Sequence, residues 1–363
     1  MGEIYRPTRA EIDLDALSFN LKKIKKMLGS RRLMFVVKAN AYGHGIEEVS
    51  SFAQRKRLCD YLGVSSIEEG ILLRERGIRL PILVLGSVYP MKNFSAFVRY
   101  NLIPTISSLW GAKELEKASS KAGKITPCHI KVETGMNRIG VSRQAFEVIM
   151  EFMEKASCVR AEGVYSHFSS ADSDRTYSLE QLETFKSITD RFAGRIIRHM
   201  ANSAGLVNFP QARFDMARCG WAAYGYLKGF RPVMSIKSSL VFIKTVRKGS
   251  FISYNKTYRA EKNLRVATVP VGYGDGYLRA FSNKAHIIVG GKKCPVIGNV
   301  TMDMIMADIS GVKNAKVGDE AILMGECGRE KIGPDQLASL AGTIGYEITT
   351  LLMPRVPRIY RQS

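Results

Sequence analysis

Apolar residues in the first two thirds of the chain recur in short runs, and polar segments separate these runs. Eight runs have the length and composition of buried strands, and most are followed by stretches with helical periodicity, such as 46–57 and 145–157. Strands and helices that alternate eight times within about 225 residues are typical of a (β/α)8 barrel. The predicted strands lie at residues 33–40, 61–66, 81–87, 103–108, 128–135, 161–169, 196–203 and 216–225.

The pattern changes after about residue 232. Residues 233–246, 264–276, 286–300 and 302–310 are all strand-like, and "VGGKKC" resembles a hairpin turn. A helical stretch at 334–352 and a proline-broken tail follow. The sequence therefore predicts a barrel over residues 8–232 and a mostly β C-terminal domain over 233–363, with which residues 1–7 can pair.

Polar side chains cluster where the predicted barrel strands end, and Lys38 in "FVVKANAYGHG" is the first of them. Active sites of such barrels lie at the carboxyl ends of the strands. A desolvated lysine there can form a Schiff base with a carbonyl compound, of which pyridoxal 5′-phosphate is one. The structural alternative is a lysine that extends out of a sheet edge. A doubly wound sheet is the competing fold, but its dinucleotide-binding fingerprint is missing.

A phosphorylated cofactor also needs an anion site, and barrels often build one from the loops after their last two strands. Here these loops read "NSAG" at 202–205 and "CGWAAYG" at 219–225. Small and hydroxyl-bearing residues let backbone N–H groups approach a phosphate, although ordinary barrel turns have a similar composition.

The formal net charge of +21 raises the alternative of a nucleic-acid-binding protein. The basic residues are scattered, however, and no finger, basic zipper or RNA-binding signature accompanies them. The 6 cysteines form no CxxC pair, and no apolar run has the length of a signal peptide or a membrane span. We therefore expect a soluble cytoplasmic protein with reduced thiols and no bound metal.

Nine motifs, taken in order, resemble those of the alanine racemases, and they extend over essentially the whole chain. They are "VVKANAYGHG", "KVETGMNRIGV", "SHFSSAD", "ANSAG", "ARCGWAAYG", "ISYNKTYRA", "VPVGYGDGY", "GNVTMDM" and "PRVPRIY". The resemblance implies a barrel that binds pyridoxal 5′-phosphate, a β domain and a homodimer. It also implies that L- and D-alanine are interconverted, which supplies D-alanine for peptidoglycan.

Residue by residue, the resemblance implies that Lys38 binds the cofactor as a Schiff base and that Arg218 faces the pyridine nitrogen. A guanidinium with a pKa above about 12 does not give up its proton, so that nitrogen stays unprotonated. The other cofactor contacts that it implies are Tyr42, Ser203, Gly220 and Trp221 at the phosphate, Arg138 near the phenolic oxygen, and His167 beside Arg218.

Racemisation needs a base on each face of the α-carbon, and the resemblance implies Lys38 for one face and Tyr254 of the partner subunit for the other. Both groups have unperturbed pKa values of about 10, and these values must be lowered if the groups are to act as bases near neutral pH. The substrate contacts that it implies are Arg138, Met302 and Tyr273, and Lys131 matches a lysine that many members carry as a carbamate.

The chain departs from the family pattern at some positions, and other functions share part of that pattern. Pro354 stands where some members place a phosphate-binding tyrosine, and Asn299 and Thr301 occupy variable positions near the entrance. A broader-specificity racemase shares these motifs. A related amino-acid decarboxylase has different second-domain motifs, and a noncatalytic carrier of pyridoxal 5′-phosphate lacks the second domain.

Overall fold

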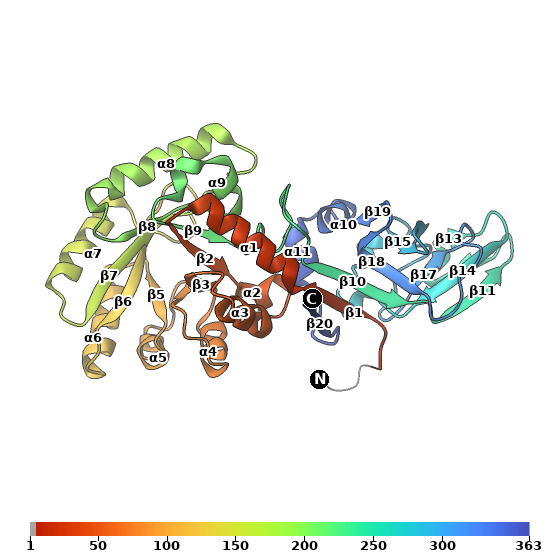
Figure 1. Cartoon of the computed structure of the whole chain (residues 1–363), viewed down its shortest axis with the longest axis horizontal. Coiled ribbons are helices and arrows are strands. Elements are labelled where there is room, and N and C mark those ends of the chain that lie inside the picture. Colours follow the sequence, from red (N-terminus) through yellow and green to blue (C-terminus); the bar gives the residue numbers. More distant parts are fainter. Residues whose placement is uncertain (1–4, 363) are drawn as a thin grey trace. The chain divides into compact units, whose positions relative to one another are not determined.

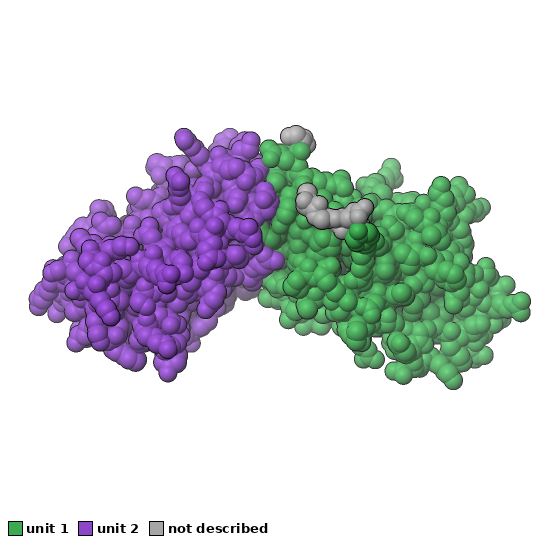
Figure 2. Space-filling view, turned by 90° about the horizontal axis from the view of Figure 1, so that it is seen from below, with its two compact units in different colours: residues 1–17, 42–45, 231–363 green, residues 18–41, 46–230 purple. Residues whose placement is uncertain are grey.

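The protein is described by a computed structural model, which covers residues 5–362. The chain divides into two compact units, shown in different colours in Figure 2. The first, called the barrel unit here, comprises residues 18–41 and 46–230; the second, the β unit, comprises 1–17, 42–45 and 231–363.

The barrel unit is built on an eight-stranded sheet in which every paired strand is parallel to its neighbour, in the order β8-β7-β6-β5-β4-β3-β2-β9. Backbone hydrogen bonds from Asp215 N–H to Arg198 O (3.0 Å) and from Arg218 N–H to Ala201 O (3.0 Å) bring the two end strands together. This confirms the predicted (β/α)8 barrel. The strands are β2 (Arg32–Val36), β3 (Tyr61–Val64), β4 (Ile82–Val84), β5 (Ile103–Ile106), β6 (Thr126–Lys131), β7 (Val159–Tyr165), β8 (Ile197–His199) and β9 (Met216–Cys219).

Helices follow most of these strands and lie on the outside of the sheet (Figure 1). Their inward faces carry apolar residues at helical spacing, as in α7, where Phe146, Ile149, Met150 and Met153 are buried. The helices are α1 (Leu14–Leu28), α2 (Lys38–Tyr42), α3 (Ile46–Arg55), α4 (Ile67–Glu75), α5 (Phe94–Tyr100), α6 (Leu109–Lys121), α7 (Arg143–Lys155), α8 (Arg175–Thr189) and α9 (Ser203–Asn208), with short 3-10 turns at Met91–Asn93, Asp190–Phe192 and Pro210–Arg213.

The β unit contains a seven-stranded sheet, a three-stranded sheet and a two-stranded ribbon, as the predicted β domain requires. The large sheet runs β16-β15-β18-β10-β1-β20, and β19 pairs with β18. Its strands are β1 (Arg9–Asp13), β10 (Met234–Ser239), β15 (His286–Val289), β16 (Lys292–Pro295), β18 (Glu320–Cys327), β19 (Glu330–Ile332) and β20 (Arg358–Arg361). The smaller sheets comprise β11 (Phe242–Val246), β14 (Leu264–Val269) and β17 (Ile305–Asp308), and β12 (Phe251–Ile252) with β13 (Tyr258–Arg259).

Local sequence explains several turns of this unit. Gly290 and Gly291 both have positive φ, at 55° and 74°, and form the two-residue turn between β15 and β16 that "VGGKKC" predicts. The predicted helix at 334–352 is two helices, α10 (Pro334–Ala341) and α11 (Gly345–Thr350), because Gly342 caps α10 at φ 69°. Short 3-10 turns lie at Tyr254–Lys256, Tyr273–Asp275 and Arg279–Phe281.

The N-terminal segment lies in the β unit. Strand β1 pairs antiparallel with β10 and parallel with β20, so residues 8–17, which the sequence analysis assigned to the barrel, belong to this unit. Residues 1–7 were predicted to be able to pair with the C-terminal β domain. Residues 1–4 of this segment lie outside the described residues. Arg6 forms an ion pair with the buried carboxylate of Asp275.

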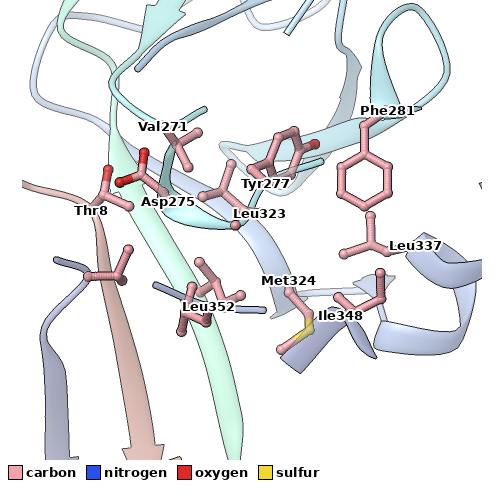
Figure 3. Close-up of a pocket in the computed structure, with 13 residues that line it drawn as sticks. Thr8, Val271, Asp275, Tyr277, Phe281, Leu323, Met324, Leu337, Ile348 and Leu352 are labelled. Atoms are coloured by element: carbon pink, nitrogen blue, oxygen red, sulfur yellow. The ribbon is translucent and has the colours of Figure 1, made fainter. Parts of the chain in front are cut away.

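A cavity of about 20 Å³ lies in the core of the β unit (Figure 3). Its wall is mainly apolar, and Tyr277 belongs to it. The Tyr277 hydroxyl is buried and has no hydrogen-bond partner among the described residues. The space is sufficient for about one water molecule.

Two further properties follow from the described residues. The six cysteines are free thiols in the structure. Within residues 5–362, none of the helices has both the length and the apolar character that a membrane crossing requires.

Candidate active site

Lys38 lies where β2 ends, and the chain immediately enters an unusual turn. Residues 39–41 of α2 have left-handed dihedral angles (φ between 52° and 55°), and Tyr42 has a φ of 53°. Left-handed helix costs roughly 1–2 kcal/mol per non-glycine residue. The turn is held by hydrogen bonds from Ala41 N–H to Val37 O (2.7 Å) and from Ile46 N–H to Asn40 Oδ1 (2.9 Å). It stops the strand and places Lys38 at the carboxyl end of β2.

The environment of Lys38 favours a neutral amine. Burial lowers the pKa of Lys38, and the positive charges of Arg138 and Arg218 lower it further, while the carboxylate of Glu69 acts in the opposite direction. A lysine with a lowered pKa has a larger neutral fraction near pH 7 and is a better nucleophile. The direction of this shift agrees with the predicted role of Lys38 as the Schiff-base residue, which stays a prediction.

Lys131, at the end of β6, is buried and lies over the ring of Tyr165, with Nζ 5.6 Å from the ring centre. Burial, followed by the charges of Arg138 and Arg218, lowers the pKa of Lys131 to about 8. Its amine is consequently neutral more often near neutral pH than that of an ordinary lysine, and the neutral amine is the form that reacts with carbon dioxide to give a carbamate.

Arg138 lies in the loop after β6, and a carboxylate organises that loop. Glu133 Oε1 accepts hydrogen bonds from the N–H groups of Thr134, Gly135 and Met136 at 2.8, 2.6 and 2.7 Å. Burial opposes ionisation of Glu133, but the backbone N–H groups of Asn137, Gly135, Met136 and Thr134 outweigh it, so the pKa of Glu133 lies below its ordinary value. Arg138 itself is exposed, and its charge acts on Lys38, Lys131 and His167.

Arg218, on β9, is a buried cation surrounded by neutral acceptors. Its Nη atoms donate to the carbonyl oxygens of His199, Ser166 and Met200 at 2.7–3.1 Å. They also donate to Nδ1 of His199 (2.9 Å) and Nδ1 of His167 (3.1 Å). Burial lowers the pKa of Arg218 to about 10, so it remains charged at neutral pH. Its Nε–H forms no hydrogen bond with the described residues and is available for a ring nitrogen.

These contacts determine the tautomers of a chain of buried histidines. An arginine only donates, so Nδ1 of His199 accepts and its proton is on Nε2. Nε2 of His199 lies 2.7 Å from Nδ1 of His129, which must accept in turn. The proton of His129 is then on Nε2, which lies 3.6 Å from Oε2 of Glu162. By the same reasoning His167 carries its proton on Nε2.

His129, His199 and Glu162 are not among the residues predicted from the sequence. The inward-facing position of His129 depends on Gly163 of the neighbouring strand, because a Cβ there would lie 2.5 Å from the His129 ring. A polar residue within a barrel strand is the sequence signal for each of the three, and it does not reveal which side chains it meets.

The buried His129 and His199, together with the half-buried His167, make stability depend on pH. Burial is the first cause that lowers the pKa of His129, His167 and His199, and Arg218 adds to it in each case. Each is neutral in the folded state but takes up a proton in the unfolded state below a pKa of about 6.5. The unfolded state then binds more protons, so stability is complete above about pH 6.5 and is lost as pH falls through the folded-state values.

We therefore expect the cofactor-free protein to lose up to about 4 kcal/mol of unfolding free energy per pH unit between about pH 6 and pH 5. Denaturant titrations at several pH values measure this slope. His199→Gln should make the slope shallower, whereas His286→Gln, at an exposed position, should leave it unchanged. A slope that is the same in all three proteins would contradict the interpretation.

The barrel residues predicted to bind the phosphate lie together at the ends of β8 and β9. Oγ of Ser203 accepts hydrogen bonds from the N–H groups of Gly220 (3.2 Å) and Ala222 (3.1 Å), so one hydroxyl and two backbone donors converge. Trp221 lies between these donors. Tyr224 has a structural role, because it is fully buried, packs on Phe35 and donates to Val36 O at 3.1 Å. Tyr42 belongs to the β unit, where its ring centre lies 6.0 Å from that of Tyr346.

The other predicted residues belong to the β unit. Tyr254, Tyr273 and Met302 have exposed fractions of 70%, 43% and 54%. Asn299 donates to Tyr254 O at 2.9 Å, and Gly274 N–H donates to Met302 O at 2.9 Å. The loops that carry these residues are therefore anchored, although their side chains remain accessible. Among residues 5–362 there is no group of three or more His, Cys, Asp and Glu side chains that could hold a metal ion.

Comparisons with known proteins agree with this architecture. Residues 12–228 match the family described as alanine racemase, N-terminal domain, and residues 233–360 match alanine racemase, C-terminal domain. The chain is 40% identical to the alanine racemase of Halothermothrix orenii, over 99% of this chain and 98% of that one. It is 41% identical to the alanine racemase of Thermodesulfovibrio yellowstonii, over 97% of each.

Solved structures show the same relationship. The alanine racemase of Clostridium difficile superposes with a TM-score of 0.92 at 36% identity, over 99% of this chain and 97% of that one. The alanine racemase of Bacillus anthracis, whose structure has bound L-Ala-P, gives a TM-score of 0.91 at 33% identity, over 100% of this chain and 97% of that one. The chain therefore belongs to the alanine racemase family.

Proposed function

We propose that this protein interconverts L- and D-alanine with pyridoxal 5′-phosphate bound at the carboxyl ends of the barrel strands. The observation that carries this proposal is Lys38, a lysine with a lowered pKa that shares one electrostatic environment with Arg138 and Arg218. The alanine racemase family depends on pyridoxal 5′-phosphate.

The residues of the barrel unit fit this cofactor. Lys38 would hold it covalently, and Ser203, Gly220 and Trp221 would bind its phosphate together with Tyr42. Arg218 has an unused Nε–H for the ring nitrogen, and Arg138 would lie near the phenolic oxygen. When bound, the cofactor acidifies the α-proton of the amino acid attached to it, because it withdraws electrons from the α-carbon.

The protein supplies the two bases. Lys38 moves a proton on one face of the α-carbon, which its lowered pKa supports. Tyr254 of the partner subunit moves the proton on the other face, and its exposed position in each subunit supports this role. His167 accepts from Arg218 through Nδ1, so its Nε2–H faces away from that contact and can orient the tyrosine.

Arg138, Met302 and Tyr273 would bind the substrate, with the backbone of Met302 at its carboxylate. A carbamate on Lys131 would replace a cation beside Arg138 by an anion, and the lowered pKa of Lys131 supports that modification. We further propose a homodimer, a cytoplasmic location and a role in supplying D-alanine for peptidoglycan, all of which rest on the family.

A panel of amino acids tests this function and its alternatives. Incubation of the purified protein with L-alanine, L-serine and L-lysine, followed by chiral chromatography, should give D-alanine as the main product. Comparable turnover of all three would favour the broader-specificity racemase. Cofactor binding with no D-amino acid in any reaction would favour the noncatalytic carrier.

A charge reversal tests the assignment of Arg218. A carboxylate in Arg218→Glu would let the ring nitrogen hold a proton, which strengthens electron withdrawal and slows the return of the proton to the α-carbon. We expect slower racemisation, new long-wavelength absorbance with L-alanine, and pyruvate from transamination. Spectra and a pyruvate assay measure this. A variant that binds the cofactor but shows neither signal would contradict the assignment.

A further inference from the structure

The left-handed turn after Lys38 has one charged contact that the proposed chemistry does not use. Oε1 of Glu69 accepts a hydrogen bond from Ala39 N–H at 2.6 Å. Its other oxygen, Oε2, accepts from Ser65 N–H at 2.8 Å and from Ser65 Oγ at 3.0 Å. One carboxylate thus connects the residue after Lys38 with the residue after β3.

This contact lies in the run of consecutive left-handed residues that follows Lys38. Ala39 begins the run of left-handed residues, with φ 53° and ψ 55°. The hydrogen bonds of the next two residues are local, because Asn40 Oδ1 accepts from Ile46 N–H and Ala41 N–H donates to Val37 O. Ala39 N–H instead donates to a side chain on α4, the helix of the following βα unit. Hydrogen bonds to a charged acceptor are among the stronger ones in proteins, so this bond opposes the relaxation of the turn.

The position of Glu69 on α4 is itself determined. Ser66 caps the helix, and its Oγ accepts from Glu69 N–H at 3.3 Å, which places Glu69 in the first turn. From there its side chain reaches back over the end of β3 toward β2, the parallel neighbour of β3. Glu68, one residue earlier, is exposed and is not part of this contact.

We propose that Glu69 is a positioning residue, which fixes the left-handed turn by joining Ala39 to Ser65 and so determines where the Lys38 amine lies. The relevance of that position to catalysis rests on the proposed function. The contact between Glu69 and Ala39 is independent of the proposed function, so it can be tested on the cofactor-free protein.

The same carboxylate has an electrostatic effect on Lys38. Burial and the charges of Arg138 and Arg218 lower the pKa of Lys38, and Glu69 is the carboxylate that raises it. The other titratable groups coupled to Lys38 are Lys131 and His167. Removing the charge of Glu69 should therefore lower the pKa of Lys38 further, whereas shortening the side chain with the charge kept should disturb mainly the turn.

The experiment compares Glu69→Gln, Glu69→Asp and the control Glu68→Gln in the cofactor-free protein. Hydrogen exchange of the peptide that contains residues 38–42 reports on the turn. Competitive chemical labelling of Lys38 across a pH series, read by mass spectrometry, reports on its amine. Thermal unfolding shows whether each variant is folded.

We expect exchange in the turn to be about 10- to 100-fold faster in Glu69→Gln and Glu69→Asp than in the wild type or Glu68→Gln. The Lys38 labelling profile should shift to lower pH in Glu69→Gln and much less in Glu69→Asp. If exchange and labelling in folded Glu69→Gln match those of Glu68→Gln, the proposal is wrong. That outcome would leave the racemase proposal intact, since neither readout depends on turnover.

Discussion

Replacing Lys38 with alanine should abolish covalent attachment of pyridoxal 5′-phosphate and reduce racemisation of alanine by several orders of magnitude. Lys38 has a lowered pKa at the carboxyl end of β2, and its amine has two roles in the proposed mechanism, as cofactor ligand and as base. Visible absorption and chiral chromatography measure the two losses. Lys113→Ala, at an exposed position on α6, is the matched control.

The attachment point can also be identified directly. Borohydride reduction of the loaded wild-type protein, followed by peptide mass spectrometry, should place the cofactor on the peptide that contains Lys38. A different labelled lysine, or a Lys38→Ala protein that retains both absorbance and turnover, would contradict the assignment.

Mixing two inactive variants should restore activity. If each active site combines Lys38 of one subunit with Tyr254 of the other, then Lys38→Ala and Tyr254→Phe homodimers are both nearly inactive. A heterodimer with two-fold arrangement has one site with both defects and one site with neither. Random reassembly makes about half of the dimers mixed, each with one of two sites intact, so activity should approach about a quarter of wild type.

Mass spectrometry of intact dimers provides the control, because it shows whether subunits have exchanged. An inactive mixture with confirmed exchange, or a dilute monomer with full turnover, would contradict the shared site. The accessibility of Tyr254 and Met302 on the β unit is the structural basis for this expectation.

Much of the fold could be predicted because its elements have strong local patterns. All eight barrel strands were predicted, since strands that are buried on both faces appear as continuous apolar runs. Strand β18 was not identified, because the short apolar run within Glu320–Cys327 fits a helix or a strand equally well. Strand β1 was missed because its partners, β10 and β20, lie more than 200 residues away.

The candidate site shows a similar division. Lys38, Arg138, His167 and Arg218 stand in recognisable motifs, and their predicted roles remain to be tested by experiment. His129, His199 and Glu162 could not be predicted, because their importance depends on which side chains meet inside the barrel. Glu69 was missed for a related reason: its sequence position indicates a helix start, while its contact to Ala39 depends on the tertiary structure.

The most direct test of the central claim is to incubate the purified, cofactor-loaded protein in D2O with either L-alanine or D-alanine. Chiral chromatography with mass spectrometry then follows both enantiomers. The account predicts that both reactions reach the same equal mixture of L- and D-alanine, with deuterium at the α-carbon of the product. A reaction that leaves either enantiomer unchanged, or that consumes alanine without forming its mirror image, would contradict it.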